Sequence, residues 1–209
     1  LRNDVVQKLG IKPTAPLRDR LAVLKGLRIS VTGVGGAANQ ALNMMIREAG
    51  LKETDVQVLP ISGQGGQLAA LLEKQIDGIV GGSPLSDQVE IGGIGTIIVR
   101  ANEIPVMSEV IYQALSTTPK GAEANPNLAR AAVRAIVKAN KYLRTDSDAP
   151  KHMNATDWKT TPTEILTLSL NRIRQDFPAN ACFTAAQANG LVKYALAVGV
   201  LTKTTDATE

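Results

Sequence analysis

The chain has 209 residues, a formal net charge of +4 and only 3% aromatic residues. Its dispersed basic residues and few aromatic side chains exclude the stacking surfaces of single-strand nucleic-acid binders, and no apolar run reaches the roughly 20 residues of a membrane-spanning helix. One cysteine and one histidine exclude an intrachain disulfide and a cysteine–histidine zinc cluster.

The first half of the chain predicts alternating strands and helices. After an N-terminal segment over 1–24, the pattern indicates strands at 28–32, 55–61 and 77–82, with helices at 36–49 and 66–75 between them. Helical crossovers of this length imply parallel strands, and the fold class is therefore α/β. Open parallel sheets bind ligands at the carboxyl ends of their strands.

The second half predicts mainly helices. Residues 93–101 and 105–117 are β-like, and the latter completes an α/β lobe over 25–117. A helical part over 118–209 follows, with helices expected at 126–143, 162–176 and 184–199. A capping box is expected at Thr161–Glu164 and another at Thr184–Gln187. We expect His152 in a polar surface loop and Cys182 as a small buried residue.

The stretch from Arg28 to Ala41 carries the strongest functional signal. A β-branched run ends in a glycine-rich turn and a helix follows at once, which aims unpaired N–H groups and the positive end of a helix dipole at one point. Two further turns, Ser62–Gly66 and Gly81–Pro84, follow the next strands. The plain alternative is that these glycines only permit tight turns. The expected ligand-binding residues are Thr32, Gly35, Gly36, Ala37, Ala38, Asn39, Ser62, Gly63, Gly65 and Ser83.

The first turn also fits a dinucleotide fingerprint, as Gly33-x-Gly35-x-x-Ala38. That reading requires an acidic residue about 20 positions on, at the end of the second strand, to hold the ribose. The second strand ends in Leu59-Pro-Ile-Ser62, without a carboxylate. An NAD(P)-dependent oxidoreductase therefore stays only as an alternative. We expect no catalytic residues and no metal or cofactor, because no base stands near a nucleophile.

Motifs along most of the chain resemble the substrate-binding proteins of nitrate, sulfonate and taurine ABC importers, the NMT1/THI5-like or SsuA-like group. They are Leu24-Lys-Gly-Leu-Arg-Ile-Ser-Val-Thr32 with its glycine turn, Ala49-Gly50-Leu51, Ala70–Pro84 with Asp77, Asn125-Pro126 through Leu143, and the segment from Thr184 to Leu201. The chain departs from the family at Gly36, where relatives carry a serine. Either backbone N–H groups carry more of the recognition, or Thr32 and Asn39 compensate for the lost hydroxyl.

The resemblance implies a lobe of the periplasmic-binding-protein type II kind, with a parallel or mixed sheet flanked by helices and with C-terminal helices. It also implies a periplasmic or membrane-anchored extracellular monomer that binds a small anionic or polar organic solute, such as a sulfonate, nitrate, a carboxylate or a heteroaromatic precursor, and passes it to an ABC transporter membrane permease. The N-terminal part of lobe one is expected to be missing from the chain. A LysR-like effector-sensing domain is a second alternative with this architecture.

Overall fold

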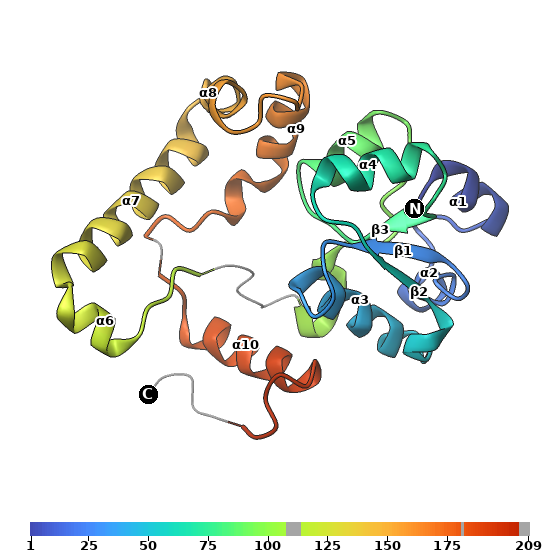
Figure 1. Ribbon diagram of the computed structural model, residues 1–209, viewed down its shortest axis with the longest axis horizontal. Helices are drawn as coiled ribbons and strands as arrows, with labels where there is room; N and C mark the ends of the chain where they lie inside the picture. The colour runs from blue at the N-terminus through green and yellow to red at the C-terminus, as the bar shows by residue number, and fades with distance from the viewer. Residues whose placement is uncertain (108–113, 181, 205–209) are drawn as a thin grey trace. The chain divides into compact units, whose positions relative to one another are not determined.

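The computed structural model describes residues 1–107, 114–180 and 182–204 (Figure 1). The chain divides into two compact units. The first contains residues 1–107 and 193–204 of the described part, and the second contains residues 114–180 and 182–192.

A small parallel sheet organises the first unit. Its strands are β1 (Arg28–Val31), β2 (Gln57–Pro60) and β3 (Gly78–Ile79), in the order β2-β1-β3. Both pairings are parallel, with Val31 opposite Pro60 and Ser30 opposite Ile79. The predicted β-α-β-α-β order and the α/β class are therefore confirmed.

Helices cover both faces of this sheet. On one face α2 (Leu17–Ala22) and α3 (Ala37–Glu48) share a core with the β1 side chains Ile29 and Val31. The other face carries α4 (Gln64–Leu72) and α5 (Leu85–Ile91), which pack around Leu71, Ile76 and Leu85. In Figure 1 the two helix pairs lie on opposite sides of the strands, as alternation of side chains along β1 requires.

Short elements complete the first unit. They are α1 (Asn3–Leu9) and the 3₁₀ turns η1 (Glu53–Asp55), η2 (Ala101–Glu103) and η3 (Pro105–Met107).

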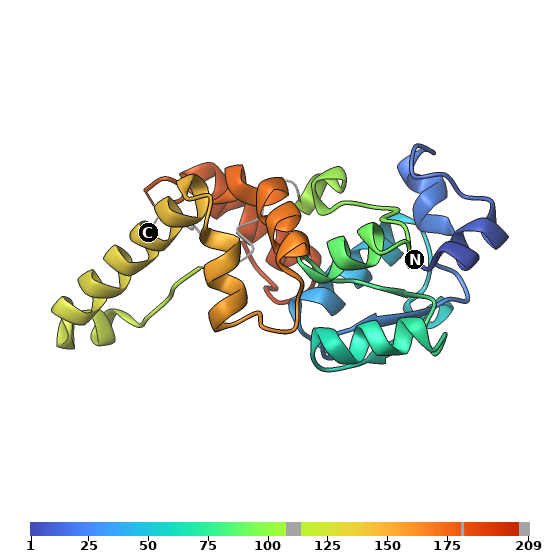
Figure 2. The same ribbon diagram turned by 90° about the horizontal axis from the view of Figure 1, so that it is seen from above.

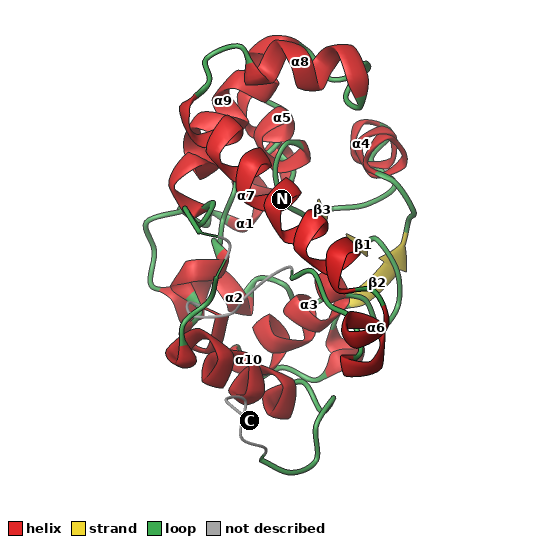
Figure 3. Cartoon of the chain, turned by 90° about the vertical axis from the view of Figure 1, so that its left-hand side faces the viewer, coloured by secondary structure: helices red, strands yellow, loops and turns green. Residues whose placement is uncertain are grey.

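Helices make up the regular structure described in the second unit, which is yellow to red in Figure 2; Figure 3 draws the helices of both units in red. The helices are α6 (Pro119–Ala124), α7 (Pro126–Thr145), α8 (Ala149–Thr156), α9 (Thr163–Ile173), the 3₁₀ turn η4 (Arg174–Asp176) and α10 (Ala185–Ala197), which contributes residues to both units. The buried side chains of the second unit include Ala149 of α8 and Leu166 and Leu170 of α9. No residue of α7 is buried, although its sequence is strongly amphipathic.

The predicted strand at 93–101 is wrong. Within this segment the structure shows one isolated antiparallel bridge, between Gly95 and Arg2, and the carbonyl oxygen of Ile98 accepts a hydrogen bond from the buried Arg20 guanidinium at 2.7 Å. A side chain thus satisfies a backbone group that a neighbouring strand would otherwise pair. The predicted strand at 105–117 begins with η3 and ends without regular structure at 114–117, while 108–113 lie outside the described residues.

Helix starts in the second half follow the predictions only partly. The capping box at Thr184 is confirmed, because its Oγ1 accepts from the Gln187 N–H at 3.2 Å while Gln187 Oε1 accepts from the Thr184 N–H at 2.9 Å. The box at Thr161 is wrong, since α9 begins after Pro162 without a side-chain cap. The expected loop around His152 is helix α8, and Cys182 is exposed rather than buried.

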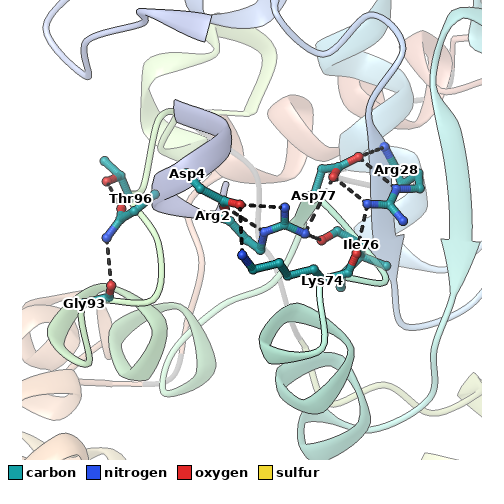
Figure 4. Close-up of polar contacts among 9 residues, drawn as sticks. Arg2, Asp4, Arg28, Lys74, Ile76, Asp77, Gly93 and Thr96 are labelled. Atoms are coloured by element: carbon teal, nitrogen blue, oxygen red, sulfur yellow. Dashed lines mark hydrogen bonds and ion pairs between the residues drawn. The ribbon is translucent and has the colours of Figure 1, made fainter. Parts of the chain in front are cut away.

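An ion-pair cluster closes the amino-terminal edge of the sheet (Figure 4). Asp77, just before β3, accepts from the Arg28 backbone N–H at 2.9 Å and from the Arg28 guanidinium at 2.8 Å. Arg2 contacts the same carboxylate at 3.7 Å and donates to the carbonyl oxygen of Ile76 at 2.6 Å. Asp77, the residue before β3, therefore ties the start of β3 to the first residue of β1, at the edge opposite the glycine turns.

Replacing Asp77 with asparagine is expected to lower the free energy of unfolding at pH 7 by about 1–3 kcal/mol, because the Arg28 donors lose a charged acceptor. Hydrogen bonding from Arg28 lowers the pKa of the Asp77 carboxyl below its ordinary 3.8. Such a group stabilises the fold above its unfolded pKa and loses that contribution as the pH falls through its folded pKa. The difference between wild type and variant should thus shrink below pH 3.8, in urea denaturation at pH 7, 5 and 3. A difference that does not change with pH would contradict this account.

Candidate functional site

The three glycine-rich turns lie at one edge of the first unit's sheet. Because β1, β2 and β3 run parallel, the segments that follow them leave from the same carboxyl-terminal edge. Hydrogen bonds continue past the strands there, from the Ile61 N–H to the Val31 carbonyl and from the Val80 N–H to the Ser30 carbonyl, both at 2.9 Å. Neighbouring strands are about 4.8 Å apart, so the turns after β2 and β3 flank the turn after β1 closely.

The turns leave this edge of the sheet toward opposite faces. The turn after β1 leads to α3 on one face of the sheet, whereas the turns after β2 and β3 lead to α4 and α5 on the other face. A crevice forms where adjacent connections leave in opposite directions, and ligands of open α/β sheets bind at that point. The central strand β1 is such a switch point.

In the first turn, internal hydrogen bonds already use part of the backbone. The Gly35 N–H donates to Asn39 Oδ1 at 2.9 Å, and the Gly36 N–H donates to the Gly33 carbonyl at a long 3.4 Å. Helix α3 begins at Ala37, and its first helical bond runs from Gln40 to the Gly36 carbonyl. Among the described residues, no hydrogen-bond acceptor is found for the N–H groups of Ala37, Ala38 and Asn39. The sequence predicts free N–H donors from Gly35 to Ala38. The described structure leaves Ala37 and Ala38 free, removes Gly35 and Gly36, and adds Asn39.

The second turn repeats this geometry on the next strand. Gly63 has φ +79°, a conformation that favours glycine, and α4 follows directly. The first helical bond of α4 runs from Gln67 to the Gly63 carbonyl. Within the described part of the chain, the N–H groups of Gln64, Gly65 and Gly66 have no acceptor. Two sets of three donors thus stand at the carboxyl-terminal edge, each at the positive end of a helix.

Side chains of the predicted site surround these donors unevenly. Thr32 and Ser62 are exposed at the ends of their strands, Ser83 is half-buried before α5, and Asn39 is buried. Residues 29–46 and 55–72 contain no lysine or arginine. An anion at this edge would therefore meet backbone N–H groups and hydroxyls rather than a positively charged side chain.

Sequence reasoning missed Gln64 and Gly66 as donors. The predicted helix starts at residue 66, while α4 starts at Gln64, because Gly65 and Gly66 read as turn residues. A Cβ on Gly66 would lie 3.1 Å from Ile61 Cγ2, so glycine lets the first turn of α4 approach the end of β2. The adjacent Gly-Gly pair was the available signal for this close approach.

No grouping of three or more metal-ligating side chains is found among the described residues. Within the same residues, no helix is both long and apolar enough to cross a membrane. Asp77, which the family resemblance places in a shared motif, lies at the opposite edge and bonds to Arg28. Asp87 is buried in the first turn of α5.

The fold of this chain is similar to that of several solved structures. A structure from Bordetella bronchiseptica RB50 is similar, with a TM-score of 0.72 and 23% identity over 98% of this chain and 63% of that one. The alkanesulfonate-binding protein SsuA from Xanthomonas axonopodis pv. citri, bound to MOPS, gives a TM-score of 0.66 and 17% identity over 90% and 63% of the two chains. A third similar structure is the periplasmic sulfonate-binding protein SsuA from Methylobacillus flagellatus KT, described as part of a putative sulfonate ABC transporter. Its TM-score is 0.58, with 21% identity over 88% of this chain and 56% of that one.

Residues 3–157 match the model of the NMT1-like family, and the chain therefore belongs to that family. It spans somewhat less than two thirds of the length of the solved structures that it resembles. No curated protein sequence matches the chain.

Proposed function

We propose that this chain forms part of the solute-binding component of an ABC importer, and that it binds a small anionic organic solute at the carboxyl-terminal edge of its sheet. One observation carries the proposal. Helices α3 and α4 follow the adjacent parallel strands β1 and β2. In the described structure the first three N–H groups of each helix have no acceptor. Paired helix N-termini favour a negatively charged group by hydrogen bonding and by their dipoles.

The proposed contacts revise the set predicted from the sequence. The N–H groups of Ala37, Ala38 and Asn39 bind one side of the anion, and those of Gln64, Gly65 and Gly66 bind the other. The hydroxyls of Thr32, Ser62 and Ser83 complete the donor set around the edge. Gly35, Gly36 and Gly63 shape the two turns, because their own hydrogen bonds and conformations fix the backbone there.

The sulfonate class is supported by the similar structures. Two of them are described as sulfonate-binding or alkanesulfonate-binding proteins, and one of these holds MOPS, itself a sulfonate. A sulfonate offers three acceptor oxygens to several N–H donors at once. Nitrate also offers three oxygens and a carboxylate offers two, and both stand beside the sulfonates in the proposal.

The remaining features of the proposal follow from the family. The chain acts without catalysis, as a periplasmic or membrane-anchored extracellular monomer that delivers its solute to a membrane permease. Its α/β lobe is proposed over 25–117, with the N-terminal segment before it and the helical part after it. An NAD(P)-dependent oxidoreductase is not favoured, because β2 ends in Leu59-Pro60 and offers no carboxylate to a ribose. A LysR-like sensing domain is not favoured by the family match.

Isothermal titration calorimetry tests this function directly. Ethanesulfonate, nitrate and acetate are titrated into the protein, with ethylammonium as a cation of matched size. Saturable binding of at least one anion, without binding of ethylammonium, is expected. Saturable binding of NADH, with no binding of ethanesulfonate, nitrate or acetate, would instead support the oxidoreductase.

A further inference from the structure

Each of the two helices at the candidate site carries a buried carboxamide in its first turn. Asn39 of α3 is 9% exposed and Gln67 of α4 is 1% exposed, in a unit whose buried side chains are mostly apolar. A buried amide group is costly unless it is hydrogen-bonded, so its bonds identify what it holds in place.

Asn39 holds the first turn. Its Oδ1 accepts from the Gly35 N–H at 2.9 Å, and the neighbouring Gln40 Nε2 donates to the Gly35 carbonyl at 3.1 Å. Gly35 has φ +75°, so both of its peptide groups are fixed at a sharp bend of the chain. The Asn39 side chain is thus engaged inside the protein, which favours a role in shaping the turn over direct contact with a solute.

Gln67 holds the second turn through the sheet. Its Nε2 donates to Ser30 Oγ at 3.2 Å, and Ser30 is fully buried in the central strand β1. The side chains of Ile29 and Val31 face α3, so Ser30 faces the opposite side, where α4 packs. This bond ties the start of α4 to the strand that leads into the first turn. The start of α4 also lies close to Ile61, the residue after β2, because Gly66 has no Cβ to hold it away.

We propose that Asn39 and Gln67 are positioning residues, which hold the two sets of N–H donors in place before any solute arrives. The ligand-binding part of this inference rests on the proposed function. Donors fixed in advance cost no ordering when they bind, and affinity therefore depends on the groups that fix them. Asn39 fixes the turn after β1, and Gln67 fixes the start of α4 against β1.

The decisive variants separate positioning from stability. Gln67→Leu leaves the Ser30 hydroxyl buried without its donor, so it lowers both stability and ethanesulfonate affinity. The double variant Ser30→Ala with Gln67→Leu removes both polar groups, which restores much of the stability. It still lacks the bond that positions α4, so its affinity is expected to stay about fivefold or more below that of the wild type. Ile46→Val, in the buried part of α3, serves as a control that lowers stability without touching either turn.

A ligand-free measurement keeps this inference separate from the proposed function. Amide hydrogen exchange and chemical shifts of Gly63–Gly66 are expected to change in the double variant and to stay as in wild type in Ile46→Val. For the first turn, Asn39→Ala is expected to lose the protection of the Gly35 N–H, while Asn39→Asp keeps an acceptor and so keeps it. Unchanged amides in both turns, or wild-type ethanesulfonate affinity in the double variant, would overturn the inference. If the wild-type protein does not bind ethanesulfonate, that ligand is excluded for the proposed site. The amide data still decide the positioning roles.

Discussion

Replacing Ala37 with proline is expected to weaken anion binding by about 10- to 100-fold and to leave stability nearly unchanged. Proline removes the N–H of the first residue of α3, one of the six proposed donors. A hydrogen bond to a charged group contributes about 1.5–3 kcal/mol, and each 1.4 kcal/mol corresponds to about tenfold in affinity. The first helical position tolerates proline, because its N–H makes no bond within the helix.

The local backbone suits this substitution. Gly36, which precedes the new proline, has φ −74° and ψ 171°, within the extended region that a residue before proline prefers. Calorimetry with ethanesulfonate measures the affinity, and urea denaturation measures the stability. Thr163→Pro, at the first position of α9, is the matched control and should leave affinity unchanged. Wild-type affinity in Ala37→Pro would remove Ala37 from the site.

Replacing Arg20 with methionine is expected to lower the free energy of unfolding by about 2–4 kcal/mol, because two backbone carbonyls lose a charged donor. Arg20 lies in α2 and is 7% exposed. Its guanidinium donates to the carbonyls of Ala15 and Ile98, both at 2.7 Å, and to Glu103 Oε2 at 2.5 Å. The variant leaves these acceptors without their donor, and the segment around Ile98 has little other regular bonding. Arg20 is therefore the side chain that holds the segment before η2 against α2.

Circular dichroism during urea denaturation measures this loss, because the single tryptophan, Trp158, belongs to the other unit. Arg100→Met provides the control. Arg100 is exposed, and its contact with Glu90 is 3.9 Å long, so about 0.5 kcal/mol or less is expected for it. Equal losses in the two variants would show that the buried bonds of Arg20 do not stabilise the first unit. Arg20→Lys is expected to recover only part of the loss, because lysine lacks the planar fork.

The sheet and its helices were predictable from the sequence because each signal was local. β-branched residues at Ile29 and Val31, the glycine turn after them and the apolar spacing of Leu42 and Ile46 all favoured the structure that formed. Parallel pairing then followed from the length of the crossovers. The position of the turns at one edge needed no contact information beyond that.

The failures came from long-range interactions. The apolar segment 93–101 has the composition of a strand, but Arg20, almost 80 residues earlier, bonds to its Ile98 carbonyl. No residue near Ile98 in the sequence indicates that Arg20 is its partner. The engagement of Gly35 by Asn39 is short-range, yet asparagine after a glycine turn suits a ligand contact and an internal contact equally well. Only coordinates separate the two readings.

The central claim is that the N–H groups at the starts of α3 and α4 bind an anion together. Nuclear magnetic resonance with ¹⁵N-labelled protein tests it most directly, by following each backbone amide during titration with ethanesulfonate. Saturable shifts are expected at Ala37, Ala38 and Asn39 and at Gln64, Gly65 and Gly66, with a common dissociation constant. Shifts confined to other residues, or different constants at the two helices, would contradict a shared site at this edge.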